Sequence, residues 1–325
     1  MLLSAIKFLI LLLFSVNFCK ASSLYFAGFA FIGNADQNIR YPIAYQIFKE
    51  DNVILSSKVK EALNGLKRND LNIIYEQGTL KKGGARALAF GLIDETVERI
   101  SNKLGIISFY KIYGQVLIFD YDNNRLILNY PVMSVYKTIT EDFPSIKEDE
   151  KIFRSLYLNL DRKASIFSHW ADIIENLEIK DSYNRIYLGV KKIEFDEGVE
   201  KQIPKKYLVN DIFKTRSAQK IEYYIAKHHN IPLIPFTLGV ALGGKGSMGL
   251  ITRFTDSISK ELVLPEIDYG INLTIRKFRK KNLENKYFRT ALYGAFINLE
   301  LIETFENKSI FSERFYWVEE VSLLK

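Results

Sequence analysis

Apolar and polar residues alternate along much of the chain with the period of two that is typical of β-strands. The clearest case is the segment 267–275, in which five apolar residues alternate with polar residues or glycine. This pattern predicts a strand with one buried face and one face in water. Shorter apolar or alternating runs predict further strands at 24–32, 71–75, 85–92, 116–119, 185–195, 231–236, 293–301 and 310–321.

Residues 115–132 predict a β-hairpin. Two apolar stretches flank Asp122-Asn123-Asn124, and Asn and Asp tolerate the positive φ angles of a tight turn. The three strands from residue 267 onward predict an antiparallel meander, whose first connection is a basic turn at 276–281.

A period of 3.6 residues predicts amphipathic helices between these strands. In the segment 165–179, Ile166, Trp170, Ile173 and Leu177 fall on one stripe, so this helix is expected to pack against a sheet. The other helices are expected at 58–66, 146–158 and 217–229.

Together these segments predict an α+β fold in which antiparallel sheet predominates and a few amphipathic helices pack on it. A chain of 325 residues can form one large core or two smaller lobes. A change of pattern at 141–150 would separate a β-rich N-terminal lobe (22–145) from an α/β C-terminal lobe (146–325) that ends in the meander. The order of elements over 185–236 resembles that of small periplasmic α/β domains of envelope-assembly proteins and implies no residue role.

Residues 1–21 predict an N-terminal signal peptide. Lys7 supplies a positive charge, and the apolar run 8–18 is shorter than the roughly 20 residues that span a bilayer. Cleavage is expected after Ala21. An alternative interpretation makes Cys19 a lipidated N-terminus, although Phe18 is bulkier than the small residue that normally precedes such a cysteine.

Export changes how composition and charge are interpreted. Cleavage would remove Cys19, the single cysteine of the chain, so the exported protein would have no disulfide and would fit a bacterial periplasm best. The full chain has a net charge of +7; without Lys7 and Lys20, 43 basic against 38 acidic residues leave +5. This mild excess permits attraction to anionic surfaces. Nucleic acid is disfavoured as a partner by the compartment.

The glycine-rich stretch 239–249 comes near the phosphate-binding motif G-x4-G-K-[ST]. The motif needs a hydroxyl residue after its lysine, whereas Gly246 follows Lys245, and a strand pattern rather than a helix follows the stretch. We therefore expect a loop rather than a nucleotide site. Lys245 remains a candidate for holding an anion with the backbone N–H groups around it.

Other motifs of catalysis and metal binding are incomplete. The segment 120–131 begins like an EF-hand loop but has Arg125 where glycine is required and Pro131 where glutamate is required. His228 and His229 are adjacent, so they point about 100° apart on a helix and cannot easily share a metal. The nucleophile motif G-x-S-x-G does not occur. We therefore predict no catalytic residue, no metal ligand and no cofactor.

The basic run at 276–281 is the strongest candidate binding site. Five cations surround Phe278 and could meet lipid phosphates or another acidic polymer. The alternative is a solvated turn whose charges protect the edge of a sheet from aggregation. The candidate anion-binding residues are Arg276, Lys277, Arg279, Lys280, Lys281 and Lys245.

These patterns predict an exported periplasmic or cell-envelope protein that is not an enzyme. It would bind a partner protein or an anionic lipid or polymer, in the assembly of the envelope or of a secreted structure. One alternative is an exported hydrolase whose carboxylates come from scattered positions. Another is a lipidated or accessory factor of a secretion system.

Overall fold

The computed structural model describes residues 22–32, 39–75, 85–102, 105–161, 163–177, 186–229, 231–236, 249–254, 259–284 and 288–324. The predicted signal peptide, with Cys19, lies outside the described residues, as does the stretch 237–248 with Lys245.

The described strands form two sheets, which confirms the predicted α+β fold. The first sheet contains β1 (Ser22–Ile32), β2 (Leu71–Ile74), β3 (Arg86–Asn102), β4 (Gly105–Asp120), β5 (Arg125–Thr140), β8 (Gly249–Phe254) and β9 (Ser259–Val263). The second contains β6 (Leu188–Phe195), β7 (Leu233–Ile234), β10 (Tyr269–Glu284), β11 (Phe288–Glu303) and β12 (Lys308–Leu324). The longest pairings, β3–β4–β5 and β10–β11–β12, are antiparallel.

The first sheet curls so that its last strand, β8, returns to β1. Its strand order is β2-β1-β3-β4-β5-β9-β8, and β8 also pairs with the C-terminal end of β1. β5 meets β9 only at the pair Arg125↔Val263. Beyond this pair, the edge of β5 that faces away from β4 has no partner strand among the residues that the structure describes.

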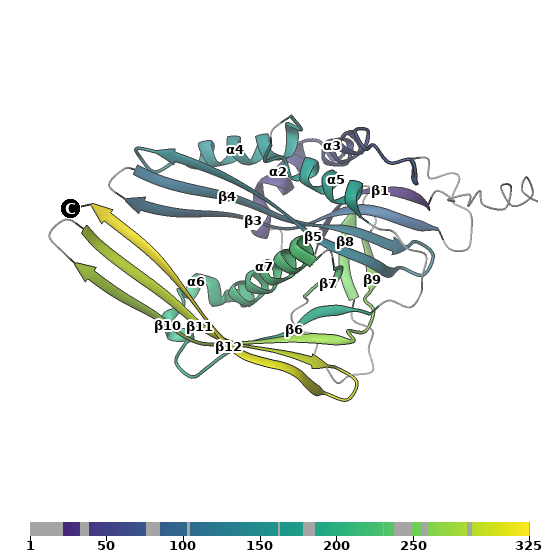
Figure 1. The fold of residues 1–325 in the computed structure, drawn as a ribbon. Coiled ribbons are helices and arrows are strands. Elements are labelled where there is room, and N and C mark those ends of the chain that lie inside the picture. Colours follow the sequence, from purple (N-terminus) through teal and green to yellow (C-terminus); the bar gives the residue numbers. More distant parts are fainter. Residues whose placement is uncertain are drawn as a thin grey trace, which may run out of the picture.

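Helices fill the space around the sheets (Figure 1). One face of the first sheet is covered by α2 (Pro42–Glu50), α3 (Ile54–Leu63), α4 (Ile146–Leu158) and α5 (Ile166–Asn176). Between the sheets lie α6 (Lys205–Leu208) and α7 (Ile212–His229), beside the 3₁₀ turns η3 (Glu200–Gln202) and η4 (Val209–Asp211). α7 contacts β5 of the first sheet and β6 of the second, so it joins the two.

The predicted amphipathic stripe of α5 is confirmed in its main part. Ile166 and Trp170 are fully buried against the first sheet, and the Trp170 ring contacts that of Phe90 edge-on at 6.2 Å. Ile173 is only half-buried. The helix ends at Asn176, and Leu177 is its C-cap.

Two local sequence features fix helix and strand geometry. Ser145 and Glu148 form a complete capping box at the start of α4, which satisfies two backbone N–H groups that the helix leaves free. Gly28 adopts φ +89° at a bulge of β1, a conformation that side chains with a Cβ rarely adopt. Next to it, Phe29 N–H donates to Ser56 Oγ at 3.0 Å, which ties α3 to the strand.

Several strands extend further than the sequence pattern predicts. β3, β4 and β5 each continue through polar stretches that had not been assigned to strands. In these stretches the polar side chains find partners on α4: both Arg99 and Tyr110 bond Asp149. The expected basic turn was also wrong, because residues 276–281 lie inside β10. α2, which no periodicity indicated, begins at Pro42.

Elements from beyond residue 146 join the first sheet. α4 and α5 pack on it, and β8 and β9 belong to it. Where the chain would separate into folding units stays a prediction. Within the described part of the chain, no helix combines the length and the apolar character needed to cross a membrane.

Candidate functional site

The basic run of β10 lies beside an aromatic strand pair. The antiparallel register places residues of β10, β11 and β12 side by side in rows, and paired residues share one face of a sheet. In the register, the rows on one face are Lys277–Phe296–Tyr316, Arg279–Gly294–Val318 and Lys281–Leu292–Glu320. We call this face of the three strands the basic–aromatic face.

Side-chain contacts confirm the first row. Lys277 Nζ lies 4.7 Å from the centre of the Phe296 ring, and the Phe296 ring stacks on that of Tyr316 at 6.3 Å. Tyr316 is 73% exposed and Val318 is 50% exposed. The face therefore offers a stripe of cations next to a stripe of exposed apolar side chains.

Among the described side chains, no carboxylate lies at salt-bridge distance from Lys277, Arg279 or Lys281 of this face, or from Lys280 on the opposite face. Arg276, at a bulge in β10, lies 3.9 Å from Asp196 Oδ2. Charges that lack a partner of the same protein remain available to an external anion.

The opposite face of the same strands contains the rest of the basic run. Phe278 contacts the ring of Phe213 of α7 at 6.2 Å, so it is not the surface aromatic that the sequence suggested. Lys280 lies over the ring of Tyr293 at 5.3 Å. Trp317 shares the row of Phe278 and is 71% exposed.

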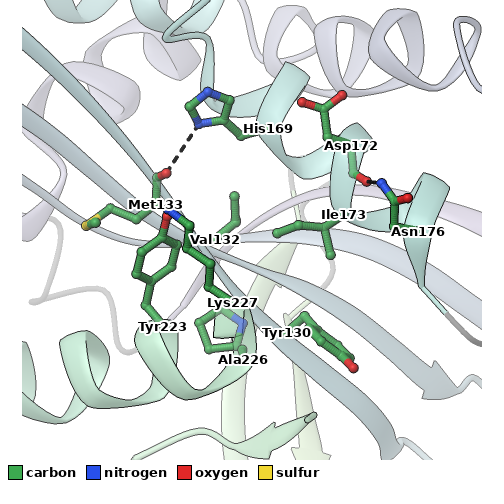
Figure 2. A pocket seen from close by; sticks show the side chains of 11 residues that line it. Tyr130, Val132, Met133, His169, Asp172, Ile173, Asn176, Tyr223, Ala226 and Lys227 are labelled. Atoms are coloured by element: carbon green, nitrogen blue, oxygen red, sulfur yellow. Dashed lines mark hydrogen bonds between the residues drawn. The ribbon is translucent and has the colours of Figure 1, made fainter. Parts of the chain in front are cut away.

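A pocket of about 490 Å³ lies at the open edge of β5 (Figure 2). β5 forms its floor, α5 one wall and α7 the other. Its apolar lining includes Val132, Ile173 and Ala226, while Asp172 and Lys227 supply charges from opposite walls. The volume falls in the range of about 300–1,000 Å³ that is ordinary for ligand sites.

His169 bridges α5 to the edge of β5. Its Nδ1 lies 3.3 Å from Met133 O, and its Nε2 lies 2.8 Å from Lys163 O. His228 stacks on the ring of Tyr224 at 6.2 Å, and His228 and His229 form the last turn of α7. Among the described residues, no group of three or more His, Cys, Asp or Glu is placed to hold a metal ion.

Among the described residues, three carboxyl groups are buried in the core. Asp94 Oδ2 lies 2.7 Å from Arg216 Nε, which joins β3 to α7. Glu95 accepts hydrogen bonds from the N–H groups of Ile43 and Ala44 at the start of α2 and from the Tyr157 hydroxyl. Glu222 accepts from the N–H of Phe236 at 2.8 Å.

Burial governs the protonation of these carboxyl groups. It raises the pKa of Asp94, against the effect of Arg216 and Arg40. It raises the pKa of Glu95 to about 7 and that of Glu222 to about 8. None of the three lines the pocket. Asp94 and Glu95 hold α7 and α2 to β3 of the first sheet, whereas Glu222 holds α7 to the segment that follows β7 of the second sheet.

A pH dependence of stability follows from Glu222. Its pKa in the folded protein, about 8, lies above the ordinary 4.5, so the folded state holds the proton more tightly than the unfolded state does. The contribution to stability is complete below pH 4.5 and is lost as the pH rises through 8. Replacing Glu222 by glutamine should reduce the fall in unfolding free energy between pH 5 and 8 by up to about 1.4 kcal/mol per pH unit.

Urea unfolding at several pH values measures this effect. Glu200→Gln, a change at an exposed glutamate of η3, is the matched control and should leave the profile unchanged. An identical pH profile for Glu222→Gln and the wild type would contradict the assignment.

Sequence reasoning found the cations of the basic–aromatic face but not its apolar half. Phe296 and Tyr316 are distant from the basic run in sequence, and only the register places them on the same face as Lys277. The run Phe315-Tyr316-Trp317 was the available signal, because consecutive aromatic residues in a strand place aromatic rings on both faces. The pocket had no sequence signal, since it is built from three separate segments.

Comparisons with known proteins do not identify a family for this chain. No protein-family model and no curated protein sequence matches the chain. Among solved structures, the chain is similar to a minor lipoprotein from Acinetobacter baumannii, with 12% sequence identity over 48% of this chain and 89% of that chain, and a TM-score of 0.27. A likeness this weak carries no argument about the function.

Proposed function

We propose that the protein is exported and attaches to an anionic lipid surface of the cell envelope through its basic–aromatic face. Export rests on the leader-like pattern of residues 1–21. Attachment rests on one observation: three cations of β10 that have no carboxylate at salt-bridge distance among the described side chains share a face with half-buried Phe296 of β11 and exposed Tyr316 and Val318 of β12.

The chemistry of a lipid surface suits this arrangement. Lysine and arginine near an anionic membrane contribute about 1 kcal/mol each. Tyrosine prefers the interface between headgroups and acyl chains, where its ring is in apolar surroundings and its hydroxyl stays in water. Lys277, Arg279 and Lys281 would meet phosphates while Tyr316 and Val318 enter the headgroup layer.

Vesicle sedimentation tests the proposal. The chain without residues 1–21 keeps every described element and loses the apolar leader, which would bind lipid by itself. It should sediment with vesicles of phosphatidylglycerol and phosphatidylcholine but not with vesicles of phosphatidylcholine alone. Binding should weaken between about 0.1 M and 1 M salt, because the Debye length falls from about 10 Å to about 3 Å. Equal binding to both vesicles, or binding that salt does not change, would reject the proposal.

The buried carboxylates do not favour the alternative of an exported hydrolase. Glycoside hydrolysis, for example, needs two carboxyl groups that both reach one bound substrate. Asp94, Glu95 and Glu222 are at most 7% exposed, and Asp172 is the carboxylate that lines the pocket among the described residues.

A further inference from the structure

The open edge of β5 offers backbone hydrogen-bonding groups inside the pocket. In an antiparallel pair, successive residues direct their N–H and C=O groups alternately toward the partner strand and away from it. Pro131 has no N–H, and its register partner on β4 is Gln115. A proline is accommodated in a strand where its nitrogen faces away from the partner, so residue 131 faces the open edge.

A second observation gives the same direction. Met133 is two residues further along β5, so its N–H and C=O should also point away from β4. The ring of His169 confirms this, because its Nδ1 lies 3.3 Å from Met133 O. The Pro131 carbonyl and the Met133 N–H therefore remain on the pocket side of the strand, with Val132 between them.

We propose that the pocket binds an extended peptide segment, which adds to β5 as a short parallel strand between α5 and α7. In a parallel pair, one guest residue donates its N–H to the carbonyl of residue i and accepts from the N–H of residue i+2. Pro131 and Met133 provide this pair of groups. An antiparallel guest at residue 131 would need the N–H that proline lacks.

The walls specify apolar guest side chains. The central guest residue would lie beside Val132 and extend its side chain toward Ile173 of α5. Its two neighbours would extend toward the other wall, where Tyr223 and Ala226 of α7 line the pocket (Figure 2). Three consecutive apolar residues therefore fit the site.

The charged residues at the rim of the pocket favour neither an acidic nor a basic peptide. Asp172 lies on the wall of α5 and Lys227 on the wall of α7, so an acidic and a basic guest would each meet one favourable group and one unfavourable group. A neutral capped peptide, N-acetyl-Val-Leu-Val-amide, is accordingly the appropriate probe.

Methionine labelling provides a direct reporter. The chain contains three methionines, Met1, Met133 and Met248, and the first has no backbone amide. A nitrogen-15 methionine label in the chain without residues 1–21 thus gives amide signals from Met133 and Met248. The signal that Met133→Leu removes is that of Met133.

The peptide should shift the Met133 amide proton downfield in a saturable manner. The same peptide with an N-methylated leucine lacks the N–H for the Pro131 carbonyl and should bind at least tenfold more weakly. Ile173→Glu, at a half-buried position, should also weaken binding at least tenfold; its thermal unfolding verifies that it folds. An unmoved Met133 signal at millimolar peptide, or equal binding of the N-methylated peptide, would overturn the proposal.

Discussion

Replacing Lys277, Arg279 and Lys281 together by glutamine is expected to weaken binding to anionic vesicles by roughly 100-fold. The three cations lie on one face of β10. Each contributes about 1 kcal/mol near an anionic surface, and about 1.4 kcal/mol corresponds to a factor of ten in affinity. Equilibrium sedimentation over a range of lipid concentrations measures the partition coefficient.

A second triple variant tests whether the position of the removed cations matters or only their number. Lys147, Lys151 and Lys163 are exposed on and after α4, on the helix layer of the first sheet. Changing them to glutamine removes the same charge but should leave the partition coefficient within about a factor of three. If both triple variants lose affinity equally, the net charge and not the basic–aromatic face determines binding.

The apolar residues of the basic–aromatic face should contribute to vesicle binding with a different salt dependence from that of its cations. Tyr316→Ser should weaken binding at every salt concentration, because the apolar contribution is not screened, whereas the loss from the lysine and arginine changes should disappear at high salt. Tyr316 is largely exposed, so this substitution should leave the fold intact. A Tyr316→Ser protein with unchanged partition would restrict the site to its cations.

Asp94→Asn is expected to lower the free energy of unfolding by about 3 kcal/mol. Asp94 is 1% exposed and bonds Arg216 through both carboxylate oxygens; Arg40 also interacts with its charge. Removing one partner of a buried pair leaves the other charge uncompensated, which costs about 3–5 kcal/mol. The lower end applies because the Arg216 side chain is 27% exposed. Urea unfolding followed by circular dichroism measures the loss.

The matched control is Glu98→Gln on the same strand. Glu98 pairs with Lys111, but its side chain is 45% exposed, and exposed ion pairs contribute at most about 1 kcal/mol. A loss of stability for Asp94→Asn no larger than that for Glu98→Gln would mean that the link between β3 and α7 is not a stabilising contact.

Local periodicity predicted the elements whose environment is uniform along their length. The strand at 267–275 and α5 keep one face toward the core along most of their length, so their apolar residues recur at the regular spacing of a strand or a helix. The sequence pattern did not predict an element correctly where the environment of its side chains changes along its length. β10 leaves the apolar core beyond Phe278, and most of its residues from Arg276 to Leu283 are cationic and increasingly exposed. The same backbone ladder with β11 continues, although the side chains no longer indicate a strand.

The burial of polar residues was a second feature that the sequence pattern did not predict. The carboxylates of β3 have the character of surface residues, yet Asp94 and Glu95 are buried. Their partners stabilise them there: Arg216 is 122 residues away from Asp94, and Tyr157 is 62 residues away from Glu95. No local pattern contains such pairs.

The sequence by itself determined the α+β class, the antiparallel meander and the list of cations, because these depend on the order of residue types along the chain. The tertiary structure decided which cations share a face with Phe296 and Tyr316, and it placed the open edge of β5 between two helices. The physical reason is that register and packing are set by contacts between distant segments. Only when those segments meet do single residues become a surface or a pocket.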